Sequence, residues 1–301
     1  MRDIIPSDED TEKFVNAIIN GLHKRKEDED LHKNGKLTYK ERCKRIVSKY
    51  GNNIKEYDNK FSDNSLESLT DLHPSMSLQE KEDYQALYKY QNASIRRLRE
   101  KILVSNGYYN GTCPLCEVNN VQTMDHFIPQ TKYPLYSINP KNLIPSCQTC
   151  NGSKSETVLD GDKRKYWNVY LDKVPHQKFL NCTFSCENGV LMAKFYITQN
   201  DIDDDTFRLL KNTMEGQKIL ETYSDGSGKI ISKLCSLIIE KLSTISNTTL
   251  EEQLVNIQNS YRNRQDSNKW EDVLTMGLAS SDLFKKLVEN ELQRLHGKNG
   301  L

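Results

Sequence analysis

The chain has 301 residues, enough for one main globular unit with a small inserted module, or for two domains. It carries 42 basic and 42 acidic residues, so bulk attraction cannot supply affinity for nucleic acid and any positive surface must be local. No window approaches the roughly 18 apolar residues that a membrane span requires, and the first residues lack the apolar region of a signal peptide. We therefore expect a soluble, cytoplasmic protein.

The first third of the chain is predicted to be helical. Residues 1–78 are polar, and low hydrophobicity between Gly51 and Asp71 indicates short helices joined by mobile loops. Residues 79–110 form a second region, because apolar residues recur at helical spacing from Leu78 to about Ser105 without glycine or proline, which predicts one amphipathic helix. The apolar positions are Tyr84, Leu87, Tyr88, Ile95, Leu98 and Ile102, and the polar side carries Lys89, Arg96, Arg97, Arg99 and Lys101. That basic side is either a solvated face or a phosphate-contacting surface.

Two CxxC pairs mark a third region, residues 111–165. Cys113 and Cys116 form the first pair and Cys147 and Cys150 the second, with about thirty residues between the pairs. Four thiolates complete a tetrahedral zinc shell, and such a closed site is structural. In a reducing compartment this pattern favours metal binding over a disulfide framework. A redox dithiol would explain one pair, but two pairs with matching spacing favour zinc.

The residues between the pairs predict a second, hydrolytic centre. Residues 124–129 can form a strand that carries Asp125 and His126, and residues 142–145 begin a second strand. Adjacent strand residues point to opposite faces, so a local twist or bulge is needed for both side chains to serve one site. A helix or helical turn is expected after the last cysteine, so that two strands and a helix surround one centre.

The last region, residues 166–301, is predicted to be a hairpin followed by helices. An aromatic, loop-like stretch over residues 166–175 precedes a hairpin near residues 182–198, whose turn is Asn188-Gly189. Helical stripes follow at 207–214, 231–242 and 284–295, the last ended by Gly297, and Thr248 with Glu251 resembles a capping box. We expect an α+β protein, mostly α-helical, with an embedded module of two strands and a helix at the cysteine pairs.

The remaining cysteines do not extend the metal site. Cys43 and Cys235 lie among helix-like residues, where a lone cysteine acts as a small core hydrophobe. Cys182 and Cys186 flank the predicted hairpin, and a second metal pair there lacks a partner pair downstream.

The residue types between the cysteine pairs suit phosphodiester hydrolysis. A neutral imidazole such as that of His126 can take a proton from water as it attacks phosphorus, and a hard cation on oxygen ligands can stabilise the developing charge. The alternative is that His126 is a packed, hydrogen-bonded residue. Lys154 is either a phosphate contact or an ordinary surface lysine.

The stretch from Cys113 to Lys154, about one seventh of the chain, resembles an HNH endonuclease of the ββα-metal superfamily. The resemblance implies that His126 is the general base, that Asp125 and Asn151 hold a divalent cation, and that Asn142 orders the loop bearing the histidine. Asn151 stands where many relatives have histidine. An amide oxygen at this position favours Mg²⁺ or Mn²⁺ over a softer ion.

A looser resemblance points to a biological role. Residues 125–134 and 142–147 are similar to the HNH effectors of bacterial anti-phage systems of the Septu and retron-associated kind. This resemblance implies cleavage of DNA and an ATPase partner that docks on the helical flanks. Two other functions stay open: an RNase that uses the same centre, and a non-catalytic, zinc-stabilised module that binds nucleic acid or protein.

Overall fold

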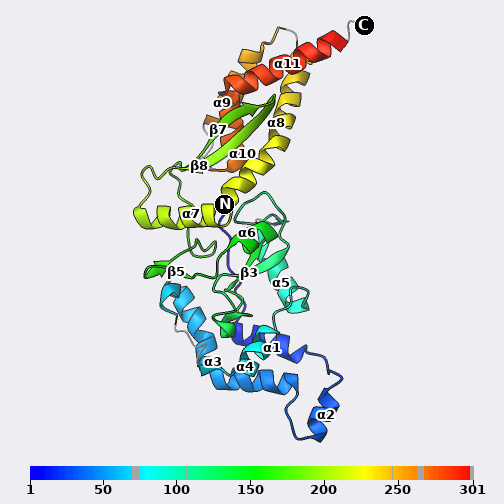
Figure 1. Ribbon diagram of the computed structural model, residues 1–301, viewed down its shortest axis with the longest axis vertical. Coiled ribbons are helices and arrows are strands. Elements are labelled where there is room, and N and C mark those ends of the chain that lie inside the picture. The colour runs from blue at the N-terminus through cyan, green and yellow to red at the C-terminus, as the bar shows by residue number, and fades with distance from the viewer. Residues whose placement is uncertain (70–74, 106, 246, 263–267, 299–301) are drawn as a thin grey trace. The chain divides into compact units, whose positions relative to one another are not determined.

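The computed structural model describes residues 1–69, 75–105, 107–245, 247–262 and 268–298. The chain is α+β, as predicted, with small antiparallel sheets among many helices (Figure 1). It divides into two compact units, which we call the N-terminal unit (residues 2–173) and the C-terminal unit (residues 174–301, with Met1). The boundaries predicted at residues 78, 110 and 165 stay predictions. No helix among the described residues is long and apolar enough to cross a membrane.

A long helix dominates the first part of the N-terminal unit. The helices here are α1 (Thr11–Asn20), α2 (Asp28–Lys33) and α3 (Tyr39–Ser62), followed by the 3-10 turn η1 (Leu66–Ser68). A capping box between Thr38 and Glu41 starts α3, and the helix is kinked at Tyr50. The prediction of mobile loops from Gly51 was therefore wrong up to Ser62, because a buried stripe every three or four residues stabilises a continuous helix. The end of that stretch, residues 70–71, lies outside the described residues.

The single helix predicted from Leu78 to about Ser105 is two helices, α4 (Leu78–Gln85) and α5 (Ala93–Ile102). Residues 86–92 connect them without helical structure. The side chain of Asn92 accepts a hydrogen bond from the backbone N–H of Ser94 at 2.8 Å and starts α5 as its N-cap. The helical spacing of apolar residues that predicted one helix continues across the connection, because α4, α5 and the connection each contribute buried side chains to the N-terminal unit.

The helices α3 and α4 pack together around a partly buried ion pair. The carboxylate of Asp83, which is 5% exposed, accepts hydrogen bonds from the Arg42 guanidinium at 2.6 and 3.0 Å. The α3 helix also contacts the segment between the two central strands: the ring of Tyr57 packs on that of Tyr136 with centroids 5.2 Å apart. The N-terminal helices therefore support that segment directly.

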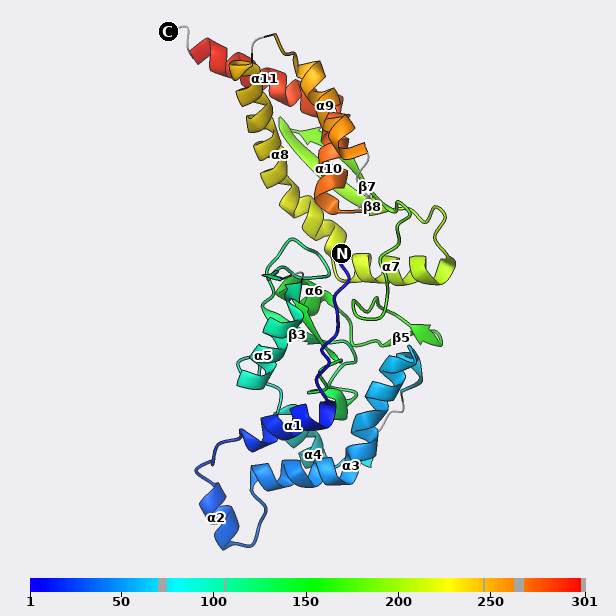
Figure 2. The ribbon, with the colours of Figure 1, turned by 180° about the vertical axis from the view of Figure 1, so that it is seen from behind.

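The central element is a strand pair followed by a helix. Strand β3 (Thr123–His126) pairs antiparallel with β4 (Leu143–Ser146), and α6 (Gln148–Ser153) follows and packs against β3 (Figures 1 and 2). Both predicted strands are present, but the first ends at His126 and not at Pro129. The helix begins earlier than predicted, at Gln148, because Cys147 is its N-cap and accepts a hydrogen bond from the N–H of Cys150.

Short elements complete the N-terminal unit. They are β1 (Val104–Ser105), β2 (Tyr108–Tyr109), the 3-10 turn η3 (Pro134–Tyr136), β5 (Leu159–Asp160) and β6 (Lys163–Arg164). The pairs β1–β2 and β5–β6 are antiparallel two-residue ladders.

The C-terminal unit is built on a hairpin. Strands β7 (Leu180–Glu187) and β8 (Val190–Ile197) pair through the predicted turn, where Asn188 and Gly189 have φ angles of 52° and 79°. Helix α8 packs on β8 and α10 on β7 (Figure 2). At Gly277 of α10 an added Cβ atom would lie 2.8 Å from the Cys182 sulfur, so glycine permits this close packing.

The remaining helices of this unit confirm the predicted stripes. They are α7 (Asp204–Gly216), α8 (Ile219–Thr244), α9 (Leu250–Arg262), α10 (Trp270–Ala279) and α11 (Asp282–Lys298). Helix α11 continues through Gly297, where we predicted its end. The predicted capping box is shifted by one residue: Thr249 and Glu252, not Thr248 and Glu251, exchange the two hydrogen bonds.

Candidate metal and catalytic site

The four predicted zinc ligands come together in the N-terminal unit. The sulfur atoms of Cys113, Cys116, Cys147 and Cys150 lie within 4.8 Å of one another, and all four residues are buried. The sulfurs of Cys116 and Cys147 are 3.8 Å apart. A tetrahedral zinc ion with Zn–S bonds of about 2.3 Å sets its sulfurs about 3.8 Å apart. The cluster therefore fits one zinc ion.

Local backbone geometry shapes the first cysteine pair. The N–H of Glu117 donates to the carbonyl of Cys113 at 2.8 Å, and Glu117 takes a left-handed φ of 55°. The N–H of Cys113 donates in turn to the carbonyl of Asn119 at 2.8 Å. This tight turn brings both thiols to the same side, where they meet the second pair at the start of α6.

Three of the four predicted catalytic residues line one surface pocket. Asp125, His126 and Asn151 line a hollow of about 220 Å³ in the N-terminal unit, together with Lys154, whereas Asn142 is not among its lining residues. The pairing of β3 with β4 is uninterrupted from Thr123 to His126, so β3 contains no bulge. His126 is the last residue of β3, and both Asp125 and His126 line the pocket without one.

A backbone carbonyl fixes the protonation of the His126 ring. The Nε2 atom lies 2.8 Å from the carbonyl oxygen of Ser137, and because a carbonyl only accepts, Nε2 carries the proton. The other ring nitrogen, Nδ1, then keeps a free lone pair. Burial lowers the pKa of His126 to about 4, against the opposing effect of the Ser137 carbonyl. The imidazole is therefore neutral at physiological pH, as a general base must be.

The side chain of Lys154 is buried, so Lys154 is not the ordinary surface lysine that the sequence left open as one possibility. Its Nζ donates to Asp125 Oδ2 at 2.9 Å and to the carbonyl oxygen of His126 at 2.6 Å. The two side chains of the pair are 6% and 9% exposed. Burial raises the pKa of Asp125, and the neighbouring ammonium of Lys154 lowers it in part. The lysine thus compensates the buried carboxylate while lining the pocket.

Asn142 connects the two ends of the segment that joins β3 to β4. It is fully buried, its side-chain oxygen accepts from the N–H of Ile128 at 2.7 Å, and its amide donates to the carbonyls of Ile128 and Tyr136 at 3.0 and 2.9 Å. These bonds hold the backbone immediately after His126. They suit the loop-ordering role that the resemblance implies.

The pocket offers oxygen ligands for a hard cation. Asp125 supplies a carboxylate, and Asn151, whose side chain carries an amide oxygen, lines the same pocket. One carboxylate and one amide oxygen fit Mg²⁺ or Mn²⁺, which keep several positions for water and phosphate. The donor set is therefore suitable for the predicted cation.

Two contacts at this site were not predicted from the sequence. Tyr88, assigned to the apolar stripe of a helix, lies in the connection between α4 and α5 and meets the His126 ring edge-on, with centroids 4.5 Å apart. Ser137, which holds the ring nitrogen, carries no motif signal. The contacts join residues that are 38 and 11 positions apart, and no local sequence pattern marks such pairs.

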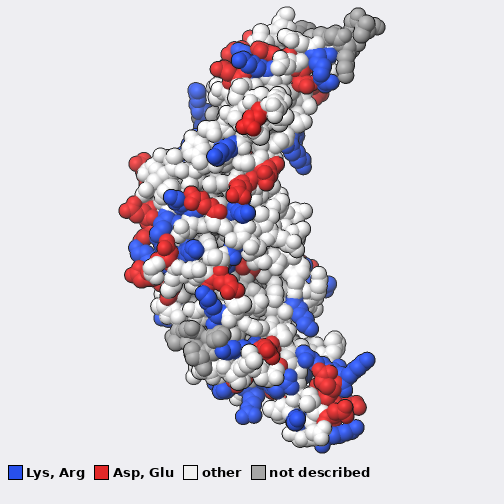
Figure 3. Space-filling view, viewed as in Figure 1, with Lys and Arg blue, Asp and Glu red and all other residues white. Residues whose placement is uncertain are grey.

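The basic side of α5 is partly engaged within the protein. Lys101 pairs with Asp8, and the Arg99 guanidinium lies over the ring of Tyr90, 4.4 Å from its centroid. Arg97 is exposed. On the face shown in Figure 3, basic and acidic side chains alternate without one large positive patch. These contacts favour the interpretation of a solvated face.

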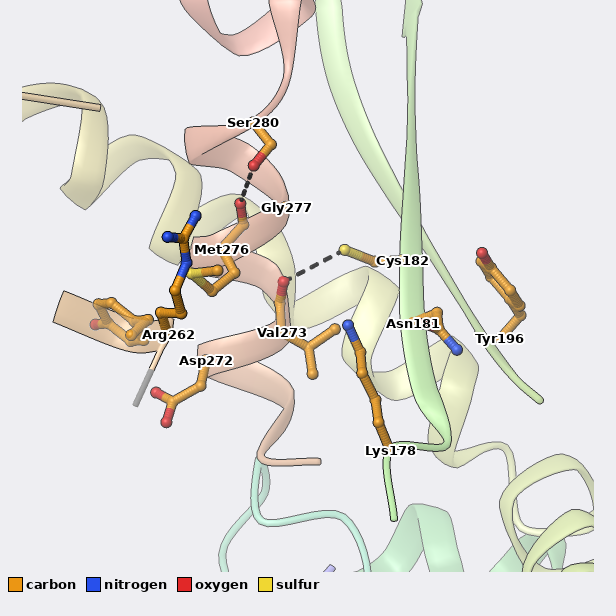
Figure 4. Close-up of a pocket in the computed structure, with 11 residues that line it drawn as sticks. Lys178, Asn181, Cys182, Tyr196, Arg262, Asp272, Val273, Met276, Gly277 and Ser280 are labelled. Carbon is orange, nitrogen blue, oxygen red and sulfur yellow. Dashed lines mark hydrogen bonds between the residues drawn. The ribbon is translucent and has the colours of Figure 1, made fainter. Parts of the chain in front are cut away.

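The C-terminal unit contains a separate hollow of about 410 Å³ between β7 and α10 (Figure 4). Lys178, Cys182 and Asp272 are among its lining residues, and none of the predicted site residues lines it. The Cys182 thiol lies 3.6 Å from the carbonyl of Val273, and burial raises its pKa to about 11. The thiol is therefore protonated. Among the described residues, the cluster of four cysteines is the one group of three or more suitable side chains that could hold a metal ion.

Comparison with known proteins finds two partial similarities. The chain is 33% identical over 92 residues to Protein ea31 of Escherichia phage lambda, which is 30% of each protein. It is 43% identical over 60 residues to Septu protein PtuB of Bacillus thuringiensis, which is 20% of this chain and 23% of that protein. The chain thus matches less than a third of the length of these relatives. No family model matches, and no solved structure matches.

Proposed function

We propose that the protein is a metal-dependent HNH-type endonuclease that hydrolyses phosphodiester bonds in DNA. The observation that supports this most strongly is the shared pocket: Asp125, His126 and Asn151 line one hollow beside a cluster of four cysteines. The His126 ring has its Nε2 hydrogen directed at a carbonyl, which leaves Nδ1 free to accept a proton from water. These are the groups that the reaction requires.

Each residue has a defined part in the proposed mechanism. His126 accepts the proton of the attacking water at Nδ1, and the Ser137 carbonyl, which accepts the Nε2 hydrogen, stabilises the imidazolium that results. Asp125 and Asn151 would hold a Mg²⁺ or Mn²⁺ ion, which when bound stabilises the charge on the phosphate and on the leaving oxygen. Asn142 keeps the backbone after His126 in place. The four cysteines would hold a structural zinc ion that stabilises the module.

The partial similarity to Septu protein PtuB supports a role in anti-phage defence. On that basis the protein would be an effector nuclease, and an ATPase partner would restrain or recruit it. Equal totals of acidic and basic residues fit recruitment by a partner, since bulk charge supplies little affinity for DNA.

The test compares wild type with His126→Ala on labelled duplex DNA, single-stranded DNA and RNA, with and without added Mg²⁺ or Mn²⁺. His23→Ala is the matched control, because His23 is exposed in the same unit. We expect cation-dependent cleavage of DNA by wild type and by the control, and none by His126→Ala at equal zinc content. Cleavage confined to RNA would identify an RNase. Full activity of His126→Ala, or no cleavage of any substrate by wild type, would contradict the proposal.

A further inference from the structure

The connection between α4 and α5 reaches the candidate catalytic histidine from outside the two-strand and helix module. Tyr88 lies in this connection, and its ring meets the His126 imidazole at an interplanar angle of 70° with centroids 4.5 Å apart. Edge-to-face contact of this kind is a preferred arrangement of aromatic rings. The contact joins residues 38 positions apart along the chain.

Tyr88 is itself fixed to the strand that carries the catalytic residues. Its hydroxyl donates to the carbonyl of Met124 at 2.8 Å, one residue before Asp125. The tyrosine is half-buried, and burial raises the pKa of its hydroxyl, so the hydroxyl keeps the proton that it donates. The ring is therefore held at one end by the backbone of β3 and cannot move away from the imidazole freely.

The second contact of the imidazole is also supported by the N-terminal helices. Ser137, whose carbonyl receives the Nε2 hydrogen of His126, is fully buried, and its hydroxyl donates to the carbonyl of Tyr84 in α4 at 3.4 Å. The adjacent Gln85 donates to the carbonyl of Gln130 at 2.5 Å. The imidazole thus has a hydrogen bond on one edge and an aromatic ring beside it, both held by the region around α4.

We propose that Tyr88 is a positioning residue for His126: its ring restricts rotation of the imidazole so that Nδ1 faces the pocket and Nε2 stays on Ser137. This inference rests on the proposed nuclease function. General-base catalysis needs the lone pair aimed at the attacking water, and a displacement of about 1 Å can cost about 100-fold in rate. The region around α4 would then contribute to catalysis by holding the His126 ring in place.

The experiment uses the full chain with four substitutions. Tyr88→Leu and Tyr88→Met remove the ring, and Tyr88→Phe keeps the ring without the hydroxyl. Tyr90→Leu is the matched control, because Tyr90 is half-buried in the same connection but contacts Arg99. Zinc content and thermal unfolding are measured for each variant, and the methionine variant serves where the leucine variant does not fold.

We expect the leucine and methionine variants to lose kcat about 10- to 100-fold with KM unchanged, because orientation and not substrate binding is disturbed. The phenylalanine variant keeps the ring but lacks its hydrogen bond to Met124, so its kcat is expected to fall less than that of the ring-deleted variants. The Tyr90→Leu control keeps a kcat close to that of wild type. A wild-type kcat in both ring-deleted variants would overturn the inference while leaving the proposed function intact. A wild type that does not cleave contradicts the proposed function instead.

A second readout does not depend on cleavage. The protein has six histidines, so ¹⁵N labelling of histidine gives a simple spectrum in which His126→Ala identifies the His126 signals. Wild type and Tyr88→Phe are expected to show one neutral tautomer of His126, protonated at Nε2. The ring-deleted variants are expected to show a mixture of the two tautomers. A single, unchanged tautomer in those variants would refute the positioning role.

Discussion

The buried ion pair between Lys154 and Asp125 gives the sharpest test of the site's energetics. Its atoms are 2.9 Å apart, and the side chains are only 6% and 9% exposed. At an effective dielectric constant of about 20 the attraction is about 6 kcal/mol, most of which offsets the desolvation of the two charges. Substituting Lys154→Met leaves the Asp125 carboxylate buried without its cation. We therefore expect the free energy of unfolding to fall by about 3 to 5 kcal/mol.

Urea denaturation in excess zinc measures this loss. The chain has two tryptophans, Trp167 in the N-terminal unit and Trp270 in the C-terminal unit, so a Trp270→Phe background makes fluorescence report on the unit that contains the pair. With a slope of about 2 kcal/mol per molar urea, the midpoint should fall by about 2 M. Trp167 is 2% exposed and should report unfolding clearly.

A surface pair of equal length provides the control. Lys24 and Glu29 are also 2.9 Å apart, but their side chains are 67% and 66% exposed, so solvent screens them. We expect Lys24→Met to leave the midpoint unchanged within error. We also expect the double variant Asp125→Asn with Lys154→Met to recover part of the loss, since it buries no unpaired charge. A midpoint for Lys154→Met as high as that of the surface variant would refute the reasoning.

Two further predictions concern the metal cluster and pH. Cys150→Ser should lower the zinc content and unfold the N-terminal unit, which metal analysis and Trp167 fluorescence would detect. The control variant Cys235→Ser should keep the zinc. Equal zinc content in both variants would contradict the assignment of Cys150 as a ligand. The pKa of His126 falls from about 6.5 in the unfolded chain to about 4 in the folded one, so the unfolded state binds more protons between these values. The stability from this neutral ring is complete above pH 6.5 and is lost as pH falls towards 4. Without added divalent cation, wild type should lose about 2 kcal/mol more than His126→Ala between pH 7.5 and 5; parallel pH profiles would show that the ring is not buried as described.

The sequence predicted the parts of the protein that depend on local pattern. The two cysteines of each CxxC pair are close in sequence, and four thiolates in two such pairs are typical of a shared metal ion. The Asn188-Gly189 turn and the alternating strands around it predicted the hairpin, because that turn requires positive φ at both positions. The sequence also predicted the order of two strands and a helix around His126, because each of these short elements depends on the residues within it.

Only the tertiary structure decided which distant residues complete the site. A continuous apolar spacing concealed the break between α4 and α5, and the break is what places Tyr88 against His126. The sequence left Lys154 open between a phosphate contact and a surface lysine, and only the structure shows its side chain buried beside Asp125. Ser137 belongs to no motif. The Tyr88 and Ser137 contacts depend on how the region around α4 packs on β3 and on the segment after it, and the Lys154 contact depends on how the end of α6 packs on β3. Side-chain spacing along one element carries no information about that packing, because burial and long-range contacts arise only when separate elements meet.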